Sequence, residues 1–176
     1  ILPDIPGEKI RGLTFGNFDD NIRPDIVVGT DKGNIVLYNN TGVININDER
    51  LKSVNFTKIL ITNLGETVWG LSSADFFFDG YQDFIAGTKS GKVILFNNTN
   101  GKFEGKNTTL ITVSGEAYGL SVTDVDNDND FDIIVGHKIG HVDIYINNKI
   151  DGSVDNESFI FKQTVTTRDQ PYGTTV

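Results

Sequence analysis

The chain is short, acidic and free of cysteine. Its 176 residues are enough for one domain with a sizeable core, and its formal net charge of −9 argues against binding to nucleic acid or to anionic membrane surfaces. No apolar run approaches the roughly 18 residues that span a bilayer, so we expect no membrane insertion. The absence of cysteine excludes disulfides and thiol chemistry. Because methionine is also absent and Ile1 comes first, we expect a processed or trimmed product.

Three segments of the chain align with one another, which is the signature of a repeat architecture. Each contains an aspartate directly before a short apolar run, and these aspartates are Asp25, Asp83 and Asp132, spaced by 58 and 49 residues. A fourth copy begins at Tyr172. The aligned segments run over 11–41, 69–99 and 118–148.

Each repeat is predicted to form four short strands. The first strand ends at an acidic loop, as over 68–74, and the second is the apolar run that follows the aspartate. Because the second strand is apolar along its whole length, it is predicted to be buried on both faces. These second strands are expected at 26–28, 84–86 and 133–135.

A tight turn with glycine at a fixed offset then leads to the third strand, and a polar loop leads to the fourth. The turns are Gly29–Gly33, Gly87–Gly91 and Gly136–Gly140. The third strands are expected at 35–38, 93–96 and 142–146. The fourth are expected at 56–61, 110–113 and 159–165, after surface loops at 40–54, 98–108 and 147–158.

Four-stranded units of about 50 residues that repeat along a chain indicate the blades of a β-propeller. Asn, Thr, Gly and Phe are abundant and no helical hydrophobic period is sustained, so the fold class is predicted to be all-β. We expect one repeat domain over 1–176, with three blades and the first strand of a fourth. The blades are assigned to 8–62, 66–114 and 115–166, and the further strand to 170–176.

The most acidic stretch of the chain runs from Asp124 to Asp132, and its five aspartates alternate with other residues. Alternating oxygen ligands in a tight loop are what Ca²⁺ coordination requires. Side chains of Asp124, Asp126 and Asp128 would point inward, followed by the backbone carbonyl of Asp130, and Asp132 would close the shell. An EF-hand is excluded, because its twelfth loop position needs Glu and here holds a valine. The alternative is a solvated acidic turn without a metal.

These repeats resemble the FG-GAP/VCBS family, which forms the propellers of integrin α-subunits and occurs in many microbial extracellular proteins. The family motif, D-x-D-x-D-G-x-x-D before an apolar strand, matches the third repeat except that Asn129 replaces the glycine. Asn tolerates the left-handed conformation expected there. The second repeat departs from the motif at Phe77, and the first at Ile22.

The resemblance implies one Ca²⁺ in each loop, with a structural role for the ion. By ligand count the third site is the strongest, the first is intermediate and the second is the weakest, because Phe77 supplies no oxygen. The alternative for the first two loops is a fold held by aspartate-to-backbone hydrogen bonds. The implied ligands are, in the first loop, Asn17, Asp19, Asn21, Arg23 and Asp25; in the second, Asp75, Asp79, Tyr81 and Asp83; and in the third, Asp124, Asp126, Asp128, Asp130 and Asp132.

Three further features of the sequence lead to predictions: equivalent first-strand residues, two histidines and five sequons. Residues Arg11, Trp69, Tyr118 and Tyr172 occupy equivalent positions on the first strands, where they would either pack between blades or form a patch that stacks on sugars. His137 and His141, beside the third glycine turn, are expected to be exposed turn residues. Sequons at repeated loop positions predict a glycoprotein, or else only copied Asn-rich turns. They are at Asn39, Asn55, Asn97, Asn107 and Asn156.

Three blades do not close a ring, because propellers typically have about four to eight. We therefore expect a fragment or subunit of a larger assembly, with self-association through the incomplete edges as one route. The favoured function is a non-enzymatic, calcium-stabilised extracellular or cell-surface propeller segment for adhesion, ligand binding or assembly, with a protein or glycan partner. The alternatives are a structural subunit of an extracellular filament or surface layer, and part of a polysaccharide-acting or other hydrolytic enzyme.

Overall fold

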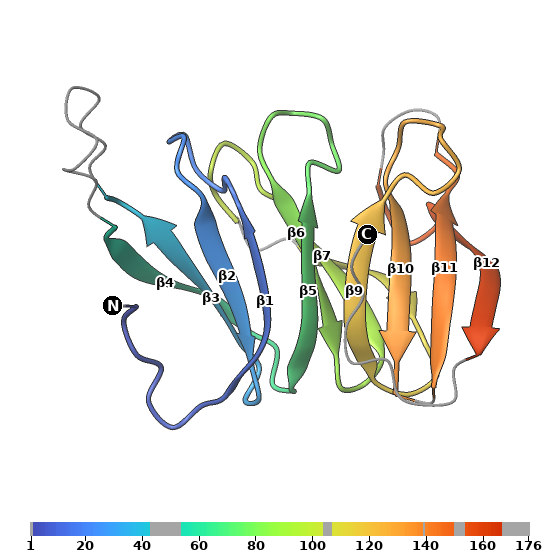
Figure 1. Cartoon of the computed structure of the whole chain (residues 1–176), viewed down its shortest axis with the longest axis horizontal. Helices are drawn as coiled ribbons and strands as arrows, with labels where there is room; N and C mark the ends of the chain where they lie inside the picture. The colour runs from blue at the N-terminus through green and yellow to red at the C-terminus, as the bar shows by residue number, and fades with distance from the viewer. Residues whose placement is uncertain (1, 43–53, 104–106, 139, 150–153, 167–176) are drawn as a thin grey trace.

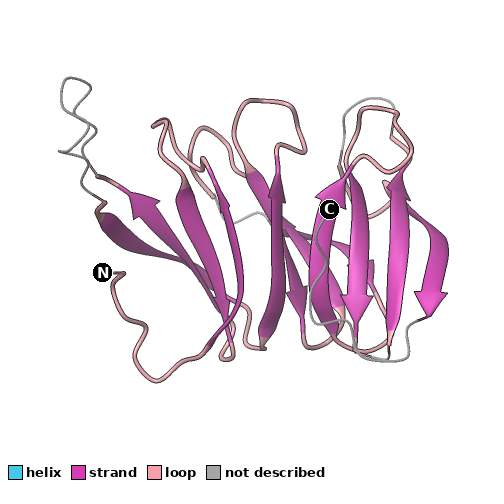
Figure 2. Cartoon of the chain, in the orientation of Figure 1, coloured by secondary structure: helices cyan, strands magenta, loops and turns pink. Residues whose placement is uncertain are grey.

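The computed structural model describes residues 2–42, 54–103, 107–138, 140–149 and 154–166. Strands are the regular elements of this part of the chain, and Figure 2 shows no helix among them. None of the described residues belongs to a helix that is long and apolar enough to cross a membrane. The strands are β1 (Ile10–Gly16), β2 (Asp25–Thr30), β3 (Asn34–Asn40), β4 (Phe56–Asn63), β5 (Val68–Ala74), β6 (Asp83–Thr88), β7 (Lys92–Phe96), β8 (Asn107–Thr112), β9 (Ala117–Thr123), β10 (Asp132–His137), β11 (His141–Asn147) and β12 (Phe159–Thr166).

The twelve strands form three sheets of four, and in each sheet the strands follow one another in chain order. Every pairing within the sheets is antiparallel. The sheets stand beside one another like the blades of a fan (Figure 1). The all-β, blade-type fold is therefore confirmed for the first blade (β1–β4), the second blade (β5–β8) and the third blade (β9–β12). The predicted strand at 170–176 lies outside the described residues.

The second strand of each blade is the most buried, as its apolar sequence predicts. All six residues of β6 are buried, and β2 and β10 each have a single half-buried residue. The glycine turns are also as predicted. Gly33, Gly91 and Gly140 have φ angles of 91°, 83° and 81°, a conformation that glycine adopts without the steric cost of a Cβ.

The blades pack through two apolar seams. The first seam joins the first and second blades and includes Val27, Ile35 and Leu37 from one side, with Leu71 and Phe84 from the other. The second seam joins the second and third blades in the same way. The strands β1, β5 and β9 lie side by side along these seams, so each blade's acidic loop comes at the same end of the molecule (Figure 1).

The outer face of the first blade is partly covered by the N-terminal segment, residues 2–8. Ile5 packs against a small cluster formed by Val28, Val36 and Tyr38. The Tyr38 hydroxyl donates a hydrogen bond of 2.7 Å to the backbone carbonyl of Pro3. The segment thus covers β2 and β3, whereas Leu13 and Phe15 on β1 stay 62% and 70% exposed.

Candidate metal centre

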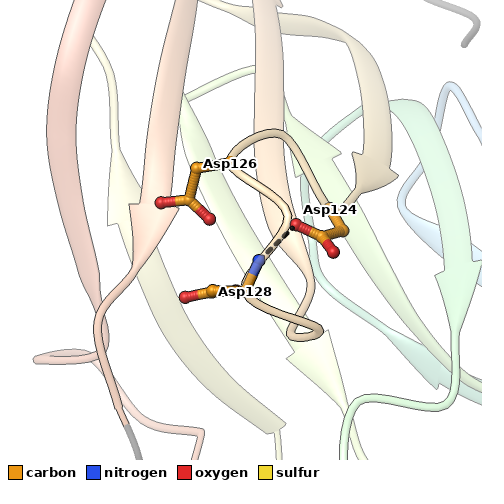
Figure 3. Close-up of side chains that lie close together, drawn as sticks. All are labelled: Asp124, Asp126 and Asp128. Atoms are coloured by element: carbon orange, nitrogen blue, oxygen red, sulfur yellow. Dashed lines mark hydrogen bonds between the residues drawn. The ribbon is translucent and has the colours of Figure 1, made fainter.

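The loop between β9 and β10 brings three carboxylates together, as Figure 3 shows. One oxygen each from Asp124, Asp126 and Asp128 lies within 4.8 Å of the others. Asp124 is half-buried, and the other two are exposed. Among the described residues, these three side chains form a group of close carboxylates whose spacing suits a metal ion. Carboxylate oxygens are the hard ligands that Ca²⁺ prefers.

The Asp124 carboxylate organises this loop, because it accepts hydrogen bonds from backbone amides of the residues that follow it. Its Oδ1 accepts from the amides of Asn127 at 2.7 Å and Asp128 at 3.2 Å, and its Oδ2 accepts from Asn129 at 3.1 Å. The Asp128 carboxylate accepts in turn from the amide of Asp130 at 3.1 Å. The chain therefore curls around the Asp124 carboxylate, and Figure 3 shows its hydrogen bond from the Asp128 amide.

Two positions of the curl need a left-handed backbone. Asn127 and Asn129 have φ angles of 62° and 73°, and asparagine is one of the few residues that enter this region readily. The left-handed conformation expected of Asn129 is confirmed. The sequence interpretation did not single out Asn127, although its neighbouring Asp-Asn pattern is typical of such turns.

The electrostatics of the third loop favour a bound cation. Burial, followed by the negative charge of Asp128, raises the pKa of Asp130 to about 6. One oxygen of Asp130 is buried without a hydrogen-bond partner in the described part of the chain. A divalent cation beside Asp128 and Asp130 would offset the repulsion between their negative charges. It would also give the unpaired Asp130 oxygen a partner, so the donor set fits Ca²⁺.

The aspartate that begins each second strand has a different environment from the loop carboxylates. Asp132 is fully buried, and its two oxygens accept from the amides of Val125 at 2.6 Å and Asn147 at 2.8 Å. These bonds fasten the loop and the end of β11 to the start of β10. The sequence predicted that Asp132 would close the metal shell, but the group of close carboxylates comprises Asp124, Asp126 and Asp128, and the Asp132 oxygens accept backbone hydrogen bonds.

The same fastening occurs in the other two blades. Asp25 accepts from the amides of Phe18 at 3.0 Å and Asn40 at 2.7 Å. Asp83 accepts from Phe76 at 2.9 Å and Asn98 at 2.8 Å. We call Asp25, Asp83 and Asp132 the anchor aspartates. Burial is the main cause of a raised pKa in all three, and it brings the pKa of Asp83 to about 7.

The second loop repeats the curl with fewer carboxylates. The Asp75 oxygens accept from the amides of Asp79 at 3.0 Å and Gly80 at 2.9 Å, and Asp79 accepts from Tyr81 at 3.0 Å. Gly80, with a φ of 90°, takes the place of Asn129. Phe77 is half-buried and packs on the second seam, so it offers the loop no oxygen.

The first loop is held by amide side chains. Asp19 accepts from the amide nitrogens of the Asn21 and Asn39 side chains at 2.6 and 2.7 Å. Asn21 accepts from the backbone amide of Arg23 at 2.7 Å, and the Arg23 side chain donates to the carbonyl of Asn40 at 2.9 Å. Asp19 is thus hydrogen-bonded mainly to side-chain amides in this loop, and calcium binding here stays a prediction.

An open, polar pocket of about 300 Å³ is lined by residues of both the first and the second loop. The hydroxyl of Tyr81 donates to Asp20 across it at 2.7 Å. The pocket is lined by Asn17, Asp19, Asp20, Asn21, Ile22, Asp79, Gly80 and Tyr81. Five of the residues predicted as ligands of these two loops thus line one shared space: Asn17, Asp19, Asn21, Asp79 and Tyr81.

Comparison with protein-family models matches residues 75–135 to the FG-GAP-like repeat. The chain carries an FG-GAP-like repeat. The matched residues run from the second loop to β10, and they include the acidic cluster of the third loop. The resemblance read from the sequence is therefore confirmed over this segment. A search of curated proteins finds no match.

Two solved structures share the fold. One is described as a crystal structure of BBS1N in complex with ARL6DN, soaked with mercury, and the other as the same complex soaked with lead. The first is 16% identical with a TM-score of 0.53, and the second is 13% identical with a TM-score of 0.52. Both cover 97% of this chain, which spans only 43% and 42% of theirs.

The equivalent first-strand residues of the three blades stack on one another. The Arg11 guanidinium lies over the Trp69 ring at 5.2 Å, and the Trp69 and Tyr118 rings are 4.6 Å apart. The ammonium of Lys138 lies over Tyr118 at 5.9 Å. This arrangement agrees with packing between blades, the first of the two interpretations. Tyr172 lies outside the described residues.

The expected exposure of both histidines is wrong for His137, which is only 2% exposed. Its Nδ1 lies 2.9 Å from the carbonyl of Ser114, and its Nε2 lies 3.0 Å from Asp143. His141 is half-buried, with its ring 5.3 Å from that of His137. The turn position suggested exposure, but β10 continues to His137 and lies against the linker from the second blade.

The sequon asparagines differ in their surroundings. Asn55, Asn107 and Asn156 are exposed, whereas Asn39 and Asn97 are half-buried. The side-chain nitrogen of Asn39, which would carry a glycan, donates instead to Asp19. Glycosylation at the three exposed sites stays a prediction.

Proposed function

We propose that the chain is a non-enzymatic, calcium-stabilised FG-GAP-like propeller segment, at the cell surface or outside the cell, that binds a protein partner. The observation that carries the calcium part is the cluster of Asp124, Asp126 and Asp128, whose ligand oxygens lie within 4.8 Å of one another. The ion would be held by these carboxylates and would act as a structural staple of the loop. Its charge would offset the repulsion that unpaired carboxylates cause.

The protein partner is supported by two observations. The two solved structures that share the fold are described as complexes of BBS1N with a second protein, ARL6DN. The aromatic side chains that would suit a glycan are engaged with one another, because Trp69 packs on Tyr118 and both rings lie beside cationic groups. A protein partner therefore fits the molecule better than a sugar that stacks on those rings.

Calcium binding is tested by thermal unfolding of the chain in EDTA and after addition of excess CaCl₂. Saturation at about 100 times the Kd corresponds to about 2.7 kcal/mol of added stability, or a rise of roughly 5–11 °C for a chain of this size. The variant with Asp126→Ala and Asp128→Ala should lose most of that rise. An unchanged melting temperature of the unmodified protein on adding CaCl₂ would remove the proposal.

A charge-matched control separates metal binding from general electrostatics. Asp4→Asn with Glu157→Gln removes two exposed carboxylates outside the three acidic loops, so the rise with CaCl₂ should persist in this variant. If the control loses the rise as well, then general charge screening rather than a site explains the effect. The partner itself is sought by affinity capture with immobilised protein, with binding compared in CaCl₂ and in EDTA.

A further inference from the structure

The third blade carries a cluster of polar side chains at the end opposite its acidic loop. Strand β10 runs away from that loop (Figure 1) and ends at His137, which lies directly opposite His141 on β11. Asp143 follows His141 by two residues. Residues directly opposite one another on paired strands project to the same face of a sheet, and so do residues two apart on one strand. The three side chains therefore share one face at one end of the blade.

Two members of this cluster replace residues that are smaller or apolar in the other blades. The equivalents are Thr30 and Thr88 for His137, and Val36 and Ile94 for Asp143. Asp143 is only 8% exposed, and a buried carboxylate is costly without a cation beside it. The ammonium of Lys138 pairs with Glu116 at 2.7 Å rather than with Asp143. The third blade thus holds a buried carboxylate whose charge needs another partner.

The contact with the linker before β9 fixes which nitrogen of His137 carries the proton. Its Nδ1 lies 2.9 Å from the backbone carbonyl of Ser114, which can only accept, so Nδ1 donates. In the neutral ring this leaves a lone pair on Nε2. Nε2 lies 3.0 Å from Oδ2 of Asp143, yet it has no hydrogen-bond partner in the described part of the chain. Two electron-rich atoms at this distance repel each other unless a cation lies beside both.

The outer partners of this pair are those that metal ligands use. Histidines that bind a metal typically donate their other N–H to a backbone carbonyl or a carboxylate, and carboxylates that bind a metal are themselves hydrogen-bonded. Nδ1 of His137 donates to Ser114, and Oδ1 of Asp143 accepts from the hydroxyl of Thr164 on β12 at 2.6 Å. The free atoms of the pair, Nε2 and Oδ2, are therefore oriented toward each other by bonds from two other segments of the chain.

His141 offers a further nitrogen beside the pair. Its ring is 5.3 Å from that of His137, and its Nδ1 is buried without a hydrogen-bond partner among the described residues. A side-chain rotation of His141 would bring this nitrogen toward the other two ligand atoms. Two imidazoles and one carboxylate suit Zn²⁺ and similar transition-metal ions, whereas Ca²⁺ takes oxygen ligands.

We propose that His137, His141 and Asp143 form a second metal site, which takes zinc or a similar transition-metal ion. Nε2 of His137 and Oδ2 of Asp143 are its first two ligands, and His141 completes the protein ligands by rotating inward. The ion offsets the charge of the buried carboxylate. Through the Ser114 contact it also ties the β10–β11 hairpin to the linker that enters the third blade. This site differs from the calcium cluster in its ligands and lies at the other end of the blade.

The first test is calorimetric titration of the whole chain, without an affinity tag, with ZnCl₂ in the presence of excess CaCl₂. We expect one zinc ion to bind per chain. Thr164→Val removes the hydroxyl that orients Asp143 but keeps the side-chain shape, so it should weaken zinc binding by about 10–100-fold. His141→Ala should also weaken it. Asp126→Ala with Asp128→Ala is the control, and it should leave zinc binding unchanged.

The second test removes the site while keeping a blade that packs. His137→Thr with Asp143→Ile places the residues of the second blade in the third, so this variant should fold, as circular dichroism can verify, but should not bind zinc. An unmodified chain that takes up no zinc would overturn the proposal. Zinc binding that survives in this variant but is lost with Asp126→Ala and Asp128→Ala would also overturn it, because the ion would then lie in the acidic loop.

Discussion

Replacement of Asp132 by alanine separates the two roles that this carboxylate can have. The side chain accepts backbone hydrogen bonds from Val125 and Asn147, and it is fully buried. Each buried amide left without an acceptor costs about 1–3 kcal/mol. Loss of the buried carboxylate offsets part of this cost, because burial disfavours its charge and raises its pKa. We therefore expect Asp132→Ala to destabilise the protein by about 2–4 kcal/mol even in EDTA.

The contrasting variant is Asp126→Ala, whose side chain is exposed and belongs to the cluster of three carboxylates in the third loop. In EDTA it should unfold like the unmodified protein, and in saturating CaCl₂ it should lack about 2.7 kcal/mol of stabilisation at 100 times the Kd. The measurement is urea unfolding followed by circular dichroism and by the fluorescence of Trp69, the single tryptophan. If Asp132→Ala were neutral in EDTA and harmful only in CaCl₂, then its backbone bonds would not hold the loop.

Three further changes test other parts of the structure. Gly29→Ala should lower the free energy of unfolding in urea by about 1–3 kcal/mol, because the new methyl group meets the Val68 side chain. Adding Val68→Ala to the same chain should recover part of this loss. Burial raises the pKa of Asp83 from 3.8 to about 7, so the folded state binds this proton more tightly than the unfolded state. In EDTA, stability should thus fall as pH rises from about 4 to 7, and Asp83→Asn should flatten that slope; an equal slope would refute the assignment. Arg11→Ala should shift Trp69 emission to longer wavelength by opening its ring to water, whereas Lys9→Ala should not.

The strands and turns were predictable because their signals are local. An apolar run of three or four residues, a glycine at a fixed offset and a polar loop recur in each repeat, and each copy supports the assignment of the others. The left-handed backbone at Asn129 followed from the motif position alone. The fold class therefore needed no knowledge of long-range contacts.

The role of the anchor aspartates depended on contacts that the sequence does not show. Asp132 accepts from Asn147, 15 residues further along the chain, and Asp25 and Asp83 have partners at the same separation. This pairing arises from the β2–β3 type hairpin, so it becomes visible only when strand register is known. The sequence offered one clue to this role. An aspartate directly before a fully buried strand is either buried itself or hydrogen-bonded to the backbone at the start of that strand.

His137 shows the limit of local interpretation most clearly. Its place next to a glycine turn indicated exposure, but the linker from the second blade covers it through the carbonyl of Ser114. The partner comes 23 residues earlier in the chain, from the linker that leads into β9. The pairing of β10 with β9, in which His137 lies opposite Ala117, brings the two together.

The linear order of the two seams has a consequence for how the molecule opens. The second blade is covered on both faces, while the first and third each share one seam with a neighbour in the described chain. In such a row of units, local opening starts at the ends, because an end unit loses only one neighbour when it unfolds. Amide hydrogens of β6 and β7 should therefore exchange with solvent deuterium most slowly.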